Sequence, residues 1–524
     1  MASVGERLVE GLRARGVEVV FGIPGVHTIE LYRGLAGSGI RHVTARHEGG
    51  AAFMADGYAR ASGKPGVAFV ITGPGLTNAL TAMGQSREDS VPVLVISGVN
   101  RRASLGQGYG LLHELPDQGG MVRTVCPSFQ VTSPEMLEPV LNKAFNALTA
   151  GRPGPVHIEI PTDVMPLPCP ALSAAPAPLP PRAPGLAELT EATALLNRAQ
   201  RPLILAGGGA RGAGAALRAL AEKLDAPVVQ TVNARGLMWA HPLSVPASPS
   251  LGAVRDLIAG ADRILAVGTE LGLTDYDMYA TDTLPDLSAM IRVDVCAEQL
   301  ARHPADIRIL ADAGELLAGL LPLVTPKRAD GAARAAACIR QARADLAGLA
   351  PKLPDQLAMV EAMRDAMPGA LIVGDSTQPV YAANLVYDHD RPGGWFNAAT
   401  GFGSLGFAPG AAVGAALAQP DAPVICLVGD GGLQFSPGEL RTAVDEKLPI
   451  TFVVWNSASY QEIAEAMEGV QIHVIGCHPS PLKMEPFAAA CDLPFQSVPC
   501  DPQALSVALR KPATGPRMIE VRAF

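Results

Sequence analysis

The sequence lacks a run of about 18 apolar residues, the length that a membrane-spanning helix needs. It also lacks a basic block, because 41 Lys and Arg residues stand against 50 Asp and Glu residues and the net charge is −9. Proteins that bind nucleic acid need a basic surface. We therefore expect no nucleic acid partner and no membrane partner.

No two cysteines have the Cys-x-x-Cys spacing that is typical of zinc sites and redox motifs. The eight cysteines are scattered, and Cys426 lies inside an apolar run. This pattern indicates reduced thiols rather than a disulfide framework. The chain begins with an amphipathic stretch, Val4 to Arg15, and no signal-peptide pattern precedes it. The predicted location is the cytoplasm.

The length of 524 residues is too great for one hydrophobic core, so several domains are expected. Residues 166–185 are rich in Pro and Ala without periodicity, which predicts a linker. A second linker, rich in Ala and Arg and predicted to be helical, runs from Thr325 to about Pro354. The predicted domains are 1–165, 186–325 and 355–524.

Short apolar runs alternate with helical patterns along all three predicted domains. The predicted strands are Val17–Phe21, Arg41–Thr44, Val67–Thr72 and Val93–Ser97, then Pro202–Ala206, Ala226–Gln230, Arg263–Val267 and Met290–Val293, then Ala370–Gly374, Val424–Val428, Ile450–Trp455 and Met518–Val521. Repeated strand–helix units predict an α/β fold with a doubly wound parallel sheet in each domain, and ligands bind such sheets at the carboxyl ends of the strands.

The most informative stretch begins at Gly429-Asp430-Gly431-Gly432, directly after a predicted strand. Ser436 is a predicted helix N-cap, with Glu439 completing a capping box. The next strand ends at Asn456-Ser457-Ala458-Ser459, so a carboxylate and further oxygen-bearing side chains follow successive strands. Magnesium takes oxygen ligands and often holds a phosphate as well. The alternative is an ordinary strand–helix–strand unit with a tight turn.

This stretch resembles the signature of thiamine-diphosphate enzymes, in which Gly-Asp-Gly is followed by a later Asn-Asn pair. The chain is identified as a member of the superfamily of decarboxylases and acetolactate synthases. The resemblance implies thiamine diphosphate and Mg²⁺ as cofactors. Ser457 stands where the family has its second Asn, so either Ser457 binds the metal or a water or Asn456 replaces it. The implied metal ligands are Asp430, Asn456, Ser457 and Ser459, and Gly431 and Gly432 would lie against the cofactor.

Three motifs of the first domain are similar to the pyrimidine-binding domain of acetolactate-synthase-like enzymes. They are Arg46-His47-Glu48-Gly49-Gly50, Ala55-Asp56-Gly57-Tyr58-Ala59-Arg60 and Gly73-Pro74-Gly75-Leu76-Thr77-Asn78. The resemblance makes Glu48 the catalytic acid that hydrogen-bonds N1′ of the aminopyrimidine. Taken alone, Glu48 could equally be a charge favoured by a helix dipole. The other implied cofactor contacts in this domain are Pro24, Gly25, Thr72 and Asn78.

Two segments of the third domain complete the implied cofactor site. Ser376 and Gln378 follow a predicted strand and would meet the diphosphate. The segment 401–407 resembles a family turn in which an apolar residue, here Leu405, wedges between the cofactor rings. The Gly403 carbonyl would accept a hydrogen bond from the 4′-amino group, which brings that nitrogen close to the reactive carbon. Taken alone, Leu405 could equally be a core residue.

The other candidate catalytic residues, each placed to contact the substrate, are His113, Glu114 and Glu462. His113 and Glu114 lie in a Gly-rich loop, 104–124, that suits substrate contact, although they could also be solvated loop residues. The paired histidines of pyruvate decarboxylases are absent, and Ile71 stands where benzoylformate decarboxylases have their active-site histidine. Glu462 and Glu465 share a helix face and would favour a 2-oxo acid with a cationic end, such as 5-guanidino-2-oxopentanoate. The alternative is a solvated helix face.

The resemblance implies decarboxylation of a small 2-oxo acid, and the residues leave the outcome open. The product is either an aldehyde or, as in acetolactate synthases, the result of enamine transfer to a second carbonyl. A non-catalytic binding protein is a third hypothesis. In this family Glu48 of one subunit faces the cofactor on Asp430 of another, so a homodimer is the minimum and a homotetramer is expected.

The middle domain holds FAD in acetolactate synthases and ADP in some decarboxylases. Here Gly207-Gly208-Gly209 follows a predicted strand, where it could cradle a dinucleotide, but that signal is weak by itself. Asp275 and Asp277 follow a later strand, and acidic residues repel a diphosphate. They argue against FAD.

Overall fold

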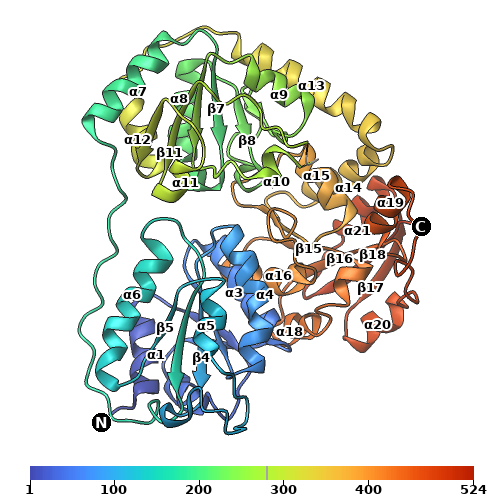
Figure 1. Ribbon diagram of the computed structural model, residues 1–524. Coiled ribbons are helices and arrows are strands. Elements are labelled where there is room, and N and C mark those ends of the chain that lie inside the picture. The colour runs from blue at the N-terminus through green and yellow to red at the C-terminus, as the bar shows by residue number, and fades with distance from the viewer. Residues whose placement is uncertain (279–280) are drawn as a thin grey trace.

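The computed structural model describes residues 1–278 and 281–524. The chain folds into three domains, each built on a six-stranded parallel sheet with flanking helices (Figure 1). In Figure 1 the N-terminal domain lies at the lower left, the middle domain at the top and the C-terminal domain at the right. The predicted α/β class with three parallel-sheet domains is confirmed. No helix of the described part of the chain is long and apolar enough to cross a membrane.

The N-terminal sheet has the strand order β2-β1-β3-β4-β6-β5. Its strands are β1 Val19–Gly22, β2 Arg41–Thr44, β3 Gly66–Val70, β4 Val93–Val99, β5 Ser128–Gln130 and β6 Val156–Pro161. Its α-helices are α1 Val4–Ala14, α2 Ile29–Leu35, α3 Glu48–Ser62, α4 Pro74–Glu88, α5 Gln118–Arg123 and α6 Leu137–Thr149. Every residue of β3 and β4 is buried, as expected for central strands covered on both faces.

The middle sheet has the order β12-β11-β10-β7-β8-β9. Its strands are β7 Pro202–Ala206, β8 Val228–Gln230, β9 Ser244–Val245, β10 Arg263–Val267, β11 Met290–Asp294 and β12 Ile307–Leu310. Its α-helices are α7 Leu186–Arg198, α8 Gly214–Leu224, α9 Gly252–Ala259, α10 Leu273–Tyr276, α11 Ala297–Ala301 and α12 Ala313–Leu320. Residues 169–185 form neither helix nor strand and run along the left of Figure 1 to α7.

The C-terminal sheet has the order β14-β13-β15-β16-β18-β17. Its strands are β13 Leu371–Gly374, β14 Trp395–Asn397, β15 Val424–Gly429, β16 Ile450–Asn456, β17 Phe495–Pro499 and β18 Arg517–Arg522. Its α-helices are α14 Leu353–Ala366, α15 Gln378–Leu385, α16 Phe407–Ala418, α17 Asp430–Leu433, α18 Glu439–Asp445, α19 Gln461–Gly469, α20 Met484–Ala490 and α21 Pro502–Leu509. Helix α13, Gly331–Leu349, lies in the predicted helical linker and packs on α9.

The N-terminal and C-terminal domains meet through α3 and α16, which share one hydrophobic cluster. Small residues make this close approach possible, because a Cβ at Gly57 would overlap the carbonyl of Ala411. Likewise, a Cβ at Gly414 would overlap the carbonyl of Met54. The contact places the start of α3, where Glu48 lies, directly against the C-terminal domain.

The predicted capping box at Ser436 is wrong. Helix α18 begins at Glu439 after Gly438, and no side chain caps it. Ser436 Oγ instead donates to the carbonyl of Gly406 at 2.7 Å. The Glu439 carboxylate accepts the backbone N–H of Arg46 and of His47, at 3.2 and 3.1 Å. Both side chains therefore make tertiary contacts in place of the local ones that their spacing suggested.

Candidate active site

Oxygen atoms from two neighbouring strand ends converge at Asp430. Because β15 and β16 pair in parallel, Asp430 and Ser457 lie side by side just beyond them. Ser457 N donates to Asp430 Oδ1 at 3.2 Å, and Ser457 Oγ lies 3.4 Å from the same oxygen. Ser457 Oγ is also 3.0 Å from the carbonyl oxygen of Ser459. The Asp430 carboxylate, the Ser457 hydroxyl and the Ser459 carbonyl thus lie together, and we call these three groups the oxygen cluster. They form a donor set that suits Mg²⁺.

The burial of Asp430 supports a cation at this point. The residue is only 6% exposed, and burial raises the pKa of its carboxyl. No Lys, Arg or His pairs with Asp430 in the described part of the chain. A buried carboxylate without a positive partner is costly, and a divalent cation would offset that cost.

Asn456 is turned away from this point. Its Nδ2 donates to Glu520 Oε1 at 2.6 Å, and its Oδ1 accepts the N–H of Ala458 at 3.1 Å. The amide therefore holds the loop after β16 in place. Of the two residues that correspond to the family's Asn pair, Ser457 is the one that lies at the oxygen cluster.

The loop after β13 packs closely against the loop after β15. A Cβ at Gly432 would lie 2.9 Å from Asp375 Oδ1, and one at Gly431 would lie 2.6 Å from the ring of Tyr460. Ser376 Oγ is buried and has no hydrogen-bond partner among the described residues. Gln378 Oε1 accepts from Trp455 Nε1 at 3.4 Å. The orphaned hydroxyl and the close glycine backbone form a cradle of the kind that binds a phosphate.

Asp375 fixes the turn that precedes α16. Its buried carboxylate accepts the N–H of Ser376, Gly406 and Ala408 at 3.0, 3.2 and 2.9 Å. Burial raises the pKa of Asp375 to about 6, while these N–H groups oppose the rise.

The turn held by Asp375 carries two of the predicted cofactor contacts. Gly403 is exposed and has a φ of 74°, a backbone conformation that favours glycine. The neighbouring Leu405 is half-buried. The turn thus leaves Gly403 exposed and Leu405 partly exposed, so both can contact a ligand.

Glu48 is the first residue of α3 and is half-buried. Asn78 Nδ2 donates to Glu48 Oε2 at 3.0 Å, so two predicted site residues meet. Gly75 lies close to this carboxylate, because a Cβ there would be 3.5 Å from Glu48 Oε1. Thr72 Oγ1, in the adjoining turn, is buried and has no hydrogen-bond partner in the part of the chain that the structure describes. Pro24 and Gly25 lie in the loop after β1, and a Cβ at Gly25 would lie 2.5 Å from Ile71 Cδ1.

The site therefore has two halves on different domains. Glu48 and Asn78 belong to the N-terminal half, whereas Asp430 and Ser457 belong to the C-terminal half. No hydrogen bond or ion pair between described residues joins these two clusters within one chain.

Glu114 stabilises its own loop through hydrogen bonds to the backbone. Its carboxylate accepts the N–H groups of Gly108, Tyr109 and Leu111 at 3.0, 3.2 and 2.9 Å. These hydrogen bonds lower the pKa of Glu114. The adjacent His113 has a φ of 61° and packs edge-on against His27, with 5.4 Å between the ring centroids. Sequence reasoning missed His27, because a single histidine in a loop carries no periodic signal.

Glu462 lies in the first turn of α19, three residues after Ser459 in the sequence. Burial raises the pKa of Glu462, the charge of Glu465 raises it further, and an interaction with Gln378 lowers it. Glu465 accepts from Gln461 Nε2 at 2.8 Å and pairs with Lys352 Nζ at 3.3 Å. Among the described residues Glu462 has no ion-pair partner. It is thus the acid of this helix face that remains available to a cation.

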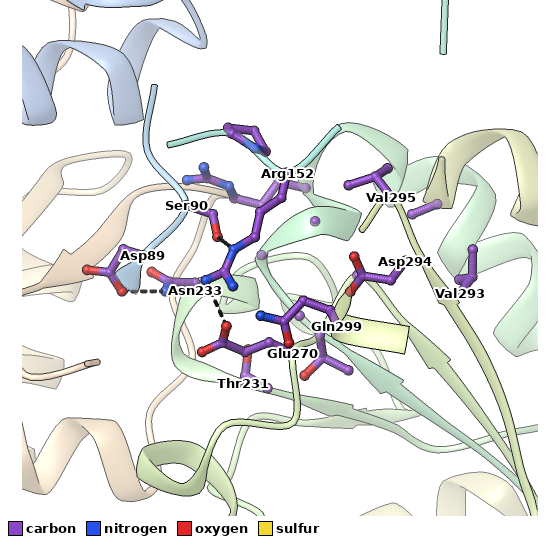
Figure 2. Close-up of a pocket in the computed structure, with 18 of the residues that line it drawn as sticks. Asp89, Ser90, Arg152, Thr231, Asn233, Glu270, Val293, Asp294, Val295 and Gln299 are labelled. Atoms are coloured by element: carbon purple, nitrogen blue, oxygen red, sulfur yellow. Dashed lines mark hydrogen bonds and ion pairs between the residues drawn. The ribbon is translucent and has the colours of Figure 1, made fainter. Parts of the chain in front are cut away.

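A cavity of about 360 Å³ lies between the N-terminal and middle domains (Figure 2). Arg152 reaches across it, donating to Ser90 Oγ at 2.8 Å and pairing with Glu270 at 2.8 Å. Asn233 Nδ2 donates to Asp89 at 3.3 Å nearby. The acidic residues that line the cavity are Glu88, Asp89, Glu270, Asp275, Asp294 and Asp312, and the basic ones are Arg60, Arg152 and Arg211.

This lining does not fit FAD. Six carboxyl side chains face three guanidinium groups, and burial raises the pKa of Asp275 to about 7 because a charge there is poorly solvated. The diphosphate of a dinucleotide would meet net negative charge. The volume also lies at the lower end of the range for ligand pockets, which is about 300–1,000 Å³.

Family models match all three domains. The N-terminal thiamine pyrophosphate (TPP) binding domain matches residues 2–121, the central domain of thiamine pyrophosphate enzymes matches 189–320, and their C-terminal TPP binding domain matches 375–521.

Curated proteins that resemble the chain fall into two groups. A probable 2-ketoarginine decarboxylase, AruI of Pseudomonas aeruginosa, is 44% identical over 485 residues, which cover 91% of this chain and 86% of the relative. The large subunit of acetolactate synthase isozyme 1 of Escherichia coli is 32% identical over 547 residues, which cover 99% and 93%. The large subunit of isozyme 3 of the same organism is 31% identical over 487 residues, which cover 87% and 82%.

Proposed function

The chain belongs to the thiamine pyrophosphate enzyme family, as an enzyme of its 2-oxo acid decarboxylase and acetolactate synthase group, and we propose that it decarboxylates 5-guanidino-2-oxopentanoate to 4-guanidinobutanal. The observation that carries this proposal is Glu462. It lies in the first turn of α19, which begins two residues after Ser459, and it lacks an ion-pair partner among the described residues. A guanidinium forms a planar two-point hydrogen bond with a carboxylate, which gives both affinity and orientation.

The comparison with known proteins points the same way. 2-Ketoarginine is another name for 5-guanidino-2-oxopentanoate, and the relative named for its decarboxylation is 44% identical. The two acetolactate synthases are 32% and 31% identical.

Residues of both halves of the site support the cofactor assignment. Asp430, Ser457 and the Ser459 carbonyl would hold Mg²⁺, and the cradle at Ser376 would take the diphosphate. Glu48, oriented by Asn78, would hold a proton at its carboxyl toward the aminopyrimidine. When bound, thiamine diphosphate supplies the electron sink that lets the carboxylate of a 2-oxo acid leave as carbon dioxide.

A second copy of the chain would complete the site. Large apolar side chains are exposed around both halves, at Val26, Ile29 and Leu112 in the N-terminal domain and at Phe435 and Ile463 in the C-terminal domain. Exposed apolar side chains gathered in this way mark an interaction surface. We infer that the N-terminal half of one subunit faces the C-terminal half of another, with a homodimer as the minimum and a homotetramer as the expected assembly.

The cytoplasm is the compartment that we propose. All eight cysteines carry free thiols, and six of them are buried. Thiols of this kind persist in a reducing compartment.

A substrate panel tests the proposal. The protein is incubated with thiamine diphosphate, Mg²⁺ and one of 5-guanidino-2-oxopentanoate, 2-oxopentanoate or pyruvate, and the products are identified by mass spectrometry. We expect 4-guanidinobutanal, with a kcat/KM roughly tenfold or more above that for 2-oxopentanoate, because one charge-assisted hydrogen-bonded pair contributes about 1.5–3 kcal/mol. Preferred use of pyruvate, with acetolactate as the product, would instead identify a carboligase.

A further inference from the structure

The turn at residues 401–407 packs against the C-terminal half of the site. Ser436 Oγ, in the loop after β15, donates to the carbonyl of Gly406 at 2.7 Å. Asp375 Oδ1 accepts the N–H of Gly406 at 3.2 Å and also lies next to Gly432, where a Cβ would be 2.9 Å from that oxygen. The conformation of the turn is therefore linked to the loop that follows β15.

The turn contains three glycines, so its conformation depends on contacts from outside. Gly401, Gly403 and Gly406 are free of the steric limits that a Cβ imposes, and the last two have φ values of 74° and 79°. Ser404 lies between the two proposed cofactor contacts, Gly403 and Leu405. It is buried, whereas Gly403 is exposed and Leu405 is partly exposed. A contact that fixes Ser404 therefore fixes both neighbours.

A glutamine of the N-terminal domain holds Ser404. Gln85 lies in the last turn of α4 and is fully buried, and its Oε1 accepts Ser404 N at 3.2 Å and Ser404 Oγ at 2.8 Å. Its Nε2 donates to Asp89 Oδ2 at 2.7 Å. The end of α4 follows the turn closely, because a Cβ at Gly84 would lie 2.6 Å from the ring of Phe402. Helix α4 thus supplies an external contact that fixes the turn.

Asp89 anchors both this glutamine and the start of the turn. Its side chain is only 2% exposed, and its Oδ2 also accepts Arg60 Nη2 at 2.7 Å. Its Oδ1 accepts Thr400 Oγ1 at 2.7 Å and Asn233 Nδ2 at 3.3 Å, so all three domains meet at this carboxylate. A buried polar network whose members are paired fixes one geometry, which apolar packing does less strictly.

We propose that Gln85 is a positioning residue for thiamine diphosphate. Through Ser404 it holds the turn that presents Gly403 and Leu405 to the cofactor rings. This proposal rests on the proposed function, which gives the chain that cofactor. The diphosphate end would be held elsewhere, by the oxygen cluster and the cradle at Ser376. Loss of Gln85 should therefore weaken binding of the rings and leave binding of the diphosphate unchanged.

Two ligands separate these contributions in calorimetric titrations of the cofactor-free, full-length protein with Mg²⁺. One is thiamine diphosphate, and the other is inorganic diphosphate, which has no rings. Gln85→Met keeps the length of the side chain and removes its amide. We expect it to bind thiamine diphosphate roughly tenfold more weakly, as is usual for the loss of buried hydrogen bonds, and to bind inorganic diphosphate like wild type.

Gln419→Met is the matched control. Gln419 also joins the C-terminal and N-terminal domains, because its Nε2 donates to the carbonyl of Ala61 at 2.9 Å, but it lies outside the turn. This variant should bind both ligands like wild type. Equal weakening of both ligands in Gln85→Met, or unchanged binding of thiamine diphosphate, would overturn the proposal. A wild type that binds no thiamine diphosphate would contradict the proposed function itself, on which the proposal rests.

Ser404→Ala tests the other end of the same contact and is the milder change, so it gives the same comparison if Gln85→Met does not fold. It removes the hydroxyl and keeps the backbone N–H, and we expect roughly fivefold weaker binding of thiamine diphosphate. Added to Gln85→Met, it should have little further effect, because its partner is already gone. Additive effects of the two substitutions would show that the residues act independently and would overturn the proposal.

Discussion

The carboxylate of Glu439 accepts the backbone N–H of His47 across the boundary between the C-terminal and N-terminal domains, at 3.1 Å. His47 directly precedes Glu48, so this hydrogen bond fixes the start of α3. A side chain at Gly50 would overlap Glu439 Oε1, which explains why glycine stands there. The position of Glu48, the proposed catalytic acid, thus depends on a residue almost 400 positions further along the chain.

Replacing Glu439 by Gln should destabilise this junction. The side chain is fully buried, and a Gln amide would turn an NH₂ group toward N–H donors that now meet a carboxylate oxygen. We expect a loss of about 1–3 kcal/mol, measured as a lower midpoint in thermal unfolding. Glu446→Gln is the matched control, because Glu446 pairs with Arg41 across the same domains at the surface and should contribute less than about 1 kcal/mol. Equal shifts in the two variants would contradict this account.

Glu48→Gln should abolish turnover while leaving the fold intact. A Gln amide cannot hold or transfer the proton, and loss of such a group typically slows a reaction about 10²–10⁴-fold. Circular dichroism and the melting midpoint should match wild type, and Glu10→Gln, at an exposed position on α1, should keep full activity. Most of the activity surviving in Glu48→Gln would show that another residue performs this step.

Asp430→Ala should lose Mg²⁺-dependent binding of thiamine diphosphate, because a hard oxygen ligand is removed. Ser457→Asn should bind at least as tightly as wild type, since an amide oxygen is a stronger donor than a hydroxyl. Calorimetric titration with and without Mg²⁺ measures both effects. Asp421→Ala, at an exposed position of the same domain, controls for the loss of a charge. Weaker binding in Ser457→Asn would show that the metal lies elsewhere.

His157 should make the N-terminal domain sensitive to acid. Its ring is fully buried between Ser97 Oγ and Ser128 Oγ, each at 2.8 Å, and burial lowers its pKa from 6.5 to about 3. At pH values between about 3 and 6.5, His157 binds a proton in the unfolded chain but not in the folded chain. The free energy of unfolding should therefore fall by about 1.4 kcal/mol per pH unit as the pH decreases from about 6 to 4.

The variant His157→Gln should lack this contribution, because Gln can bond to both hydroxyls without titrating. Urea unfolding midpoints at several pH values provide the measurement, with His473→Gln, at an exposed position, as the control. The same acid dependence in His157→Gln as in wild type would rule out this histidine as the source.

The sequence predicted the sheets well because their strands are buried on both faces. Val93–Ser97 was expected as a strand, and β4 spans Val93–Val99 with every residue buried. The oxygen cluster was also predictable, because parallel strands bring Asp430 and Ser457 to one edge.

Contacts between distant segments were not predictable from local patterns. Glu439 and Ser436 have the spacing of a capping box, yet the backbone of His47 and the carbonyl of Gly406 are their partners. Glu114 suited a substrate loop by composition, but its carboxylate is occupied by backbone N–H groups. The contact between His27 and His113 requires two loops to meet, and no spacing in the sequence encodes that.

The most direct test of the central claim is the ratio of kcat/KM for 5-guanidino-2-oxopentanoate to that for 2-oxopentanoate, measured in wild type, Glu462→Gln and Glu468→Gln. Both variants remove one charge from α19, but Glu468 lies at the far end of the helix. We predict that the ratio falls roughly tenfold or more in Glu462→Gln, as expected for the loss of one charge-assisted pair, and stays near wild type in Glu468→Gln. An unchanged ratio in Glu462→Gln, or an equal fall in both variants, would contradict the claim that Glu462 selects a cationic substrate.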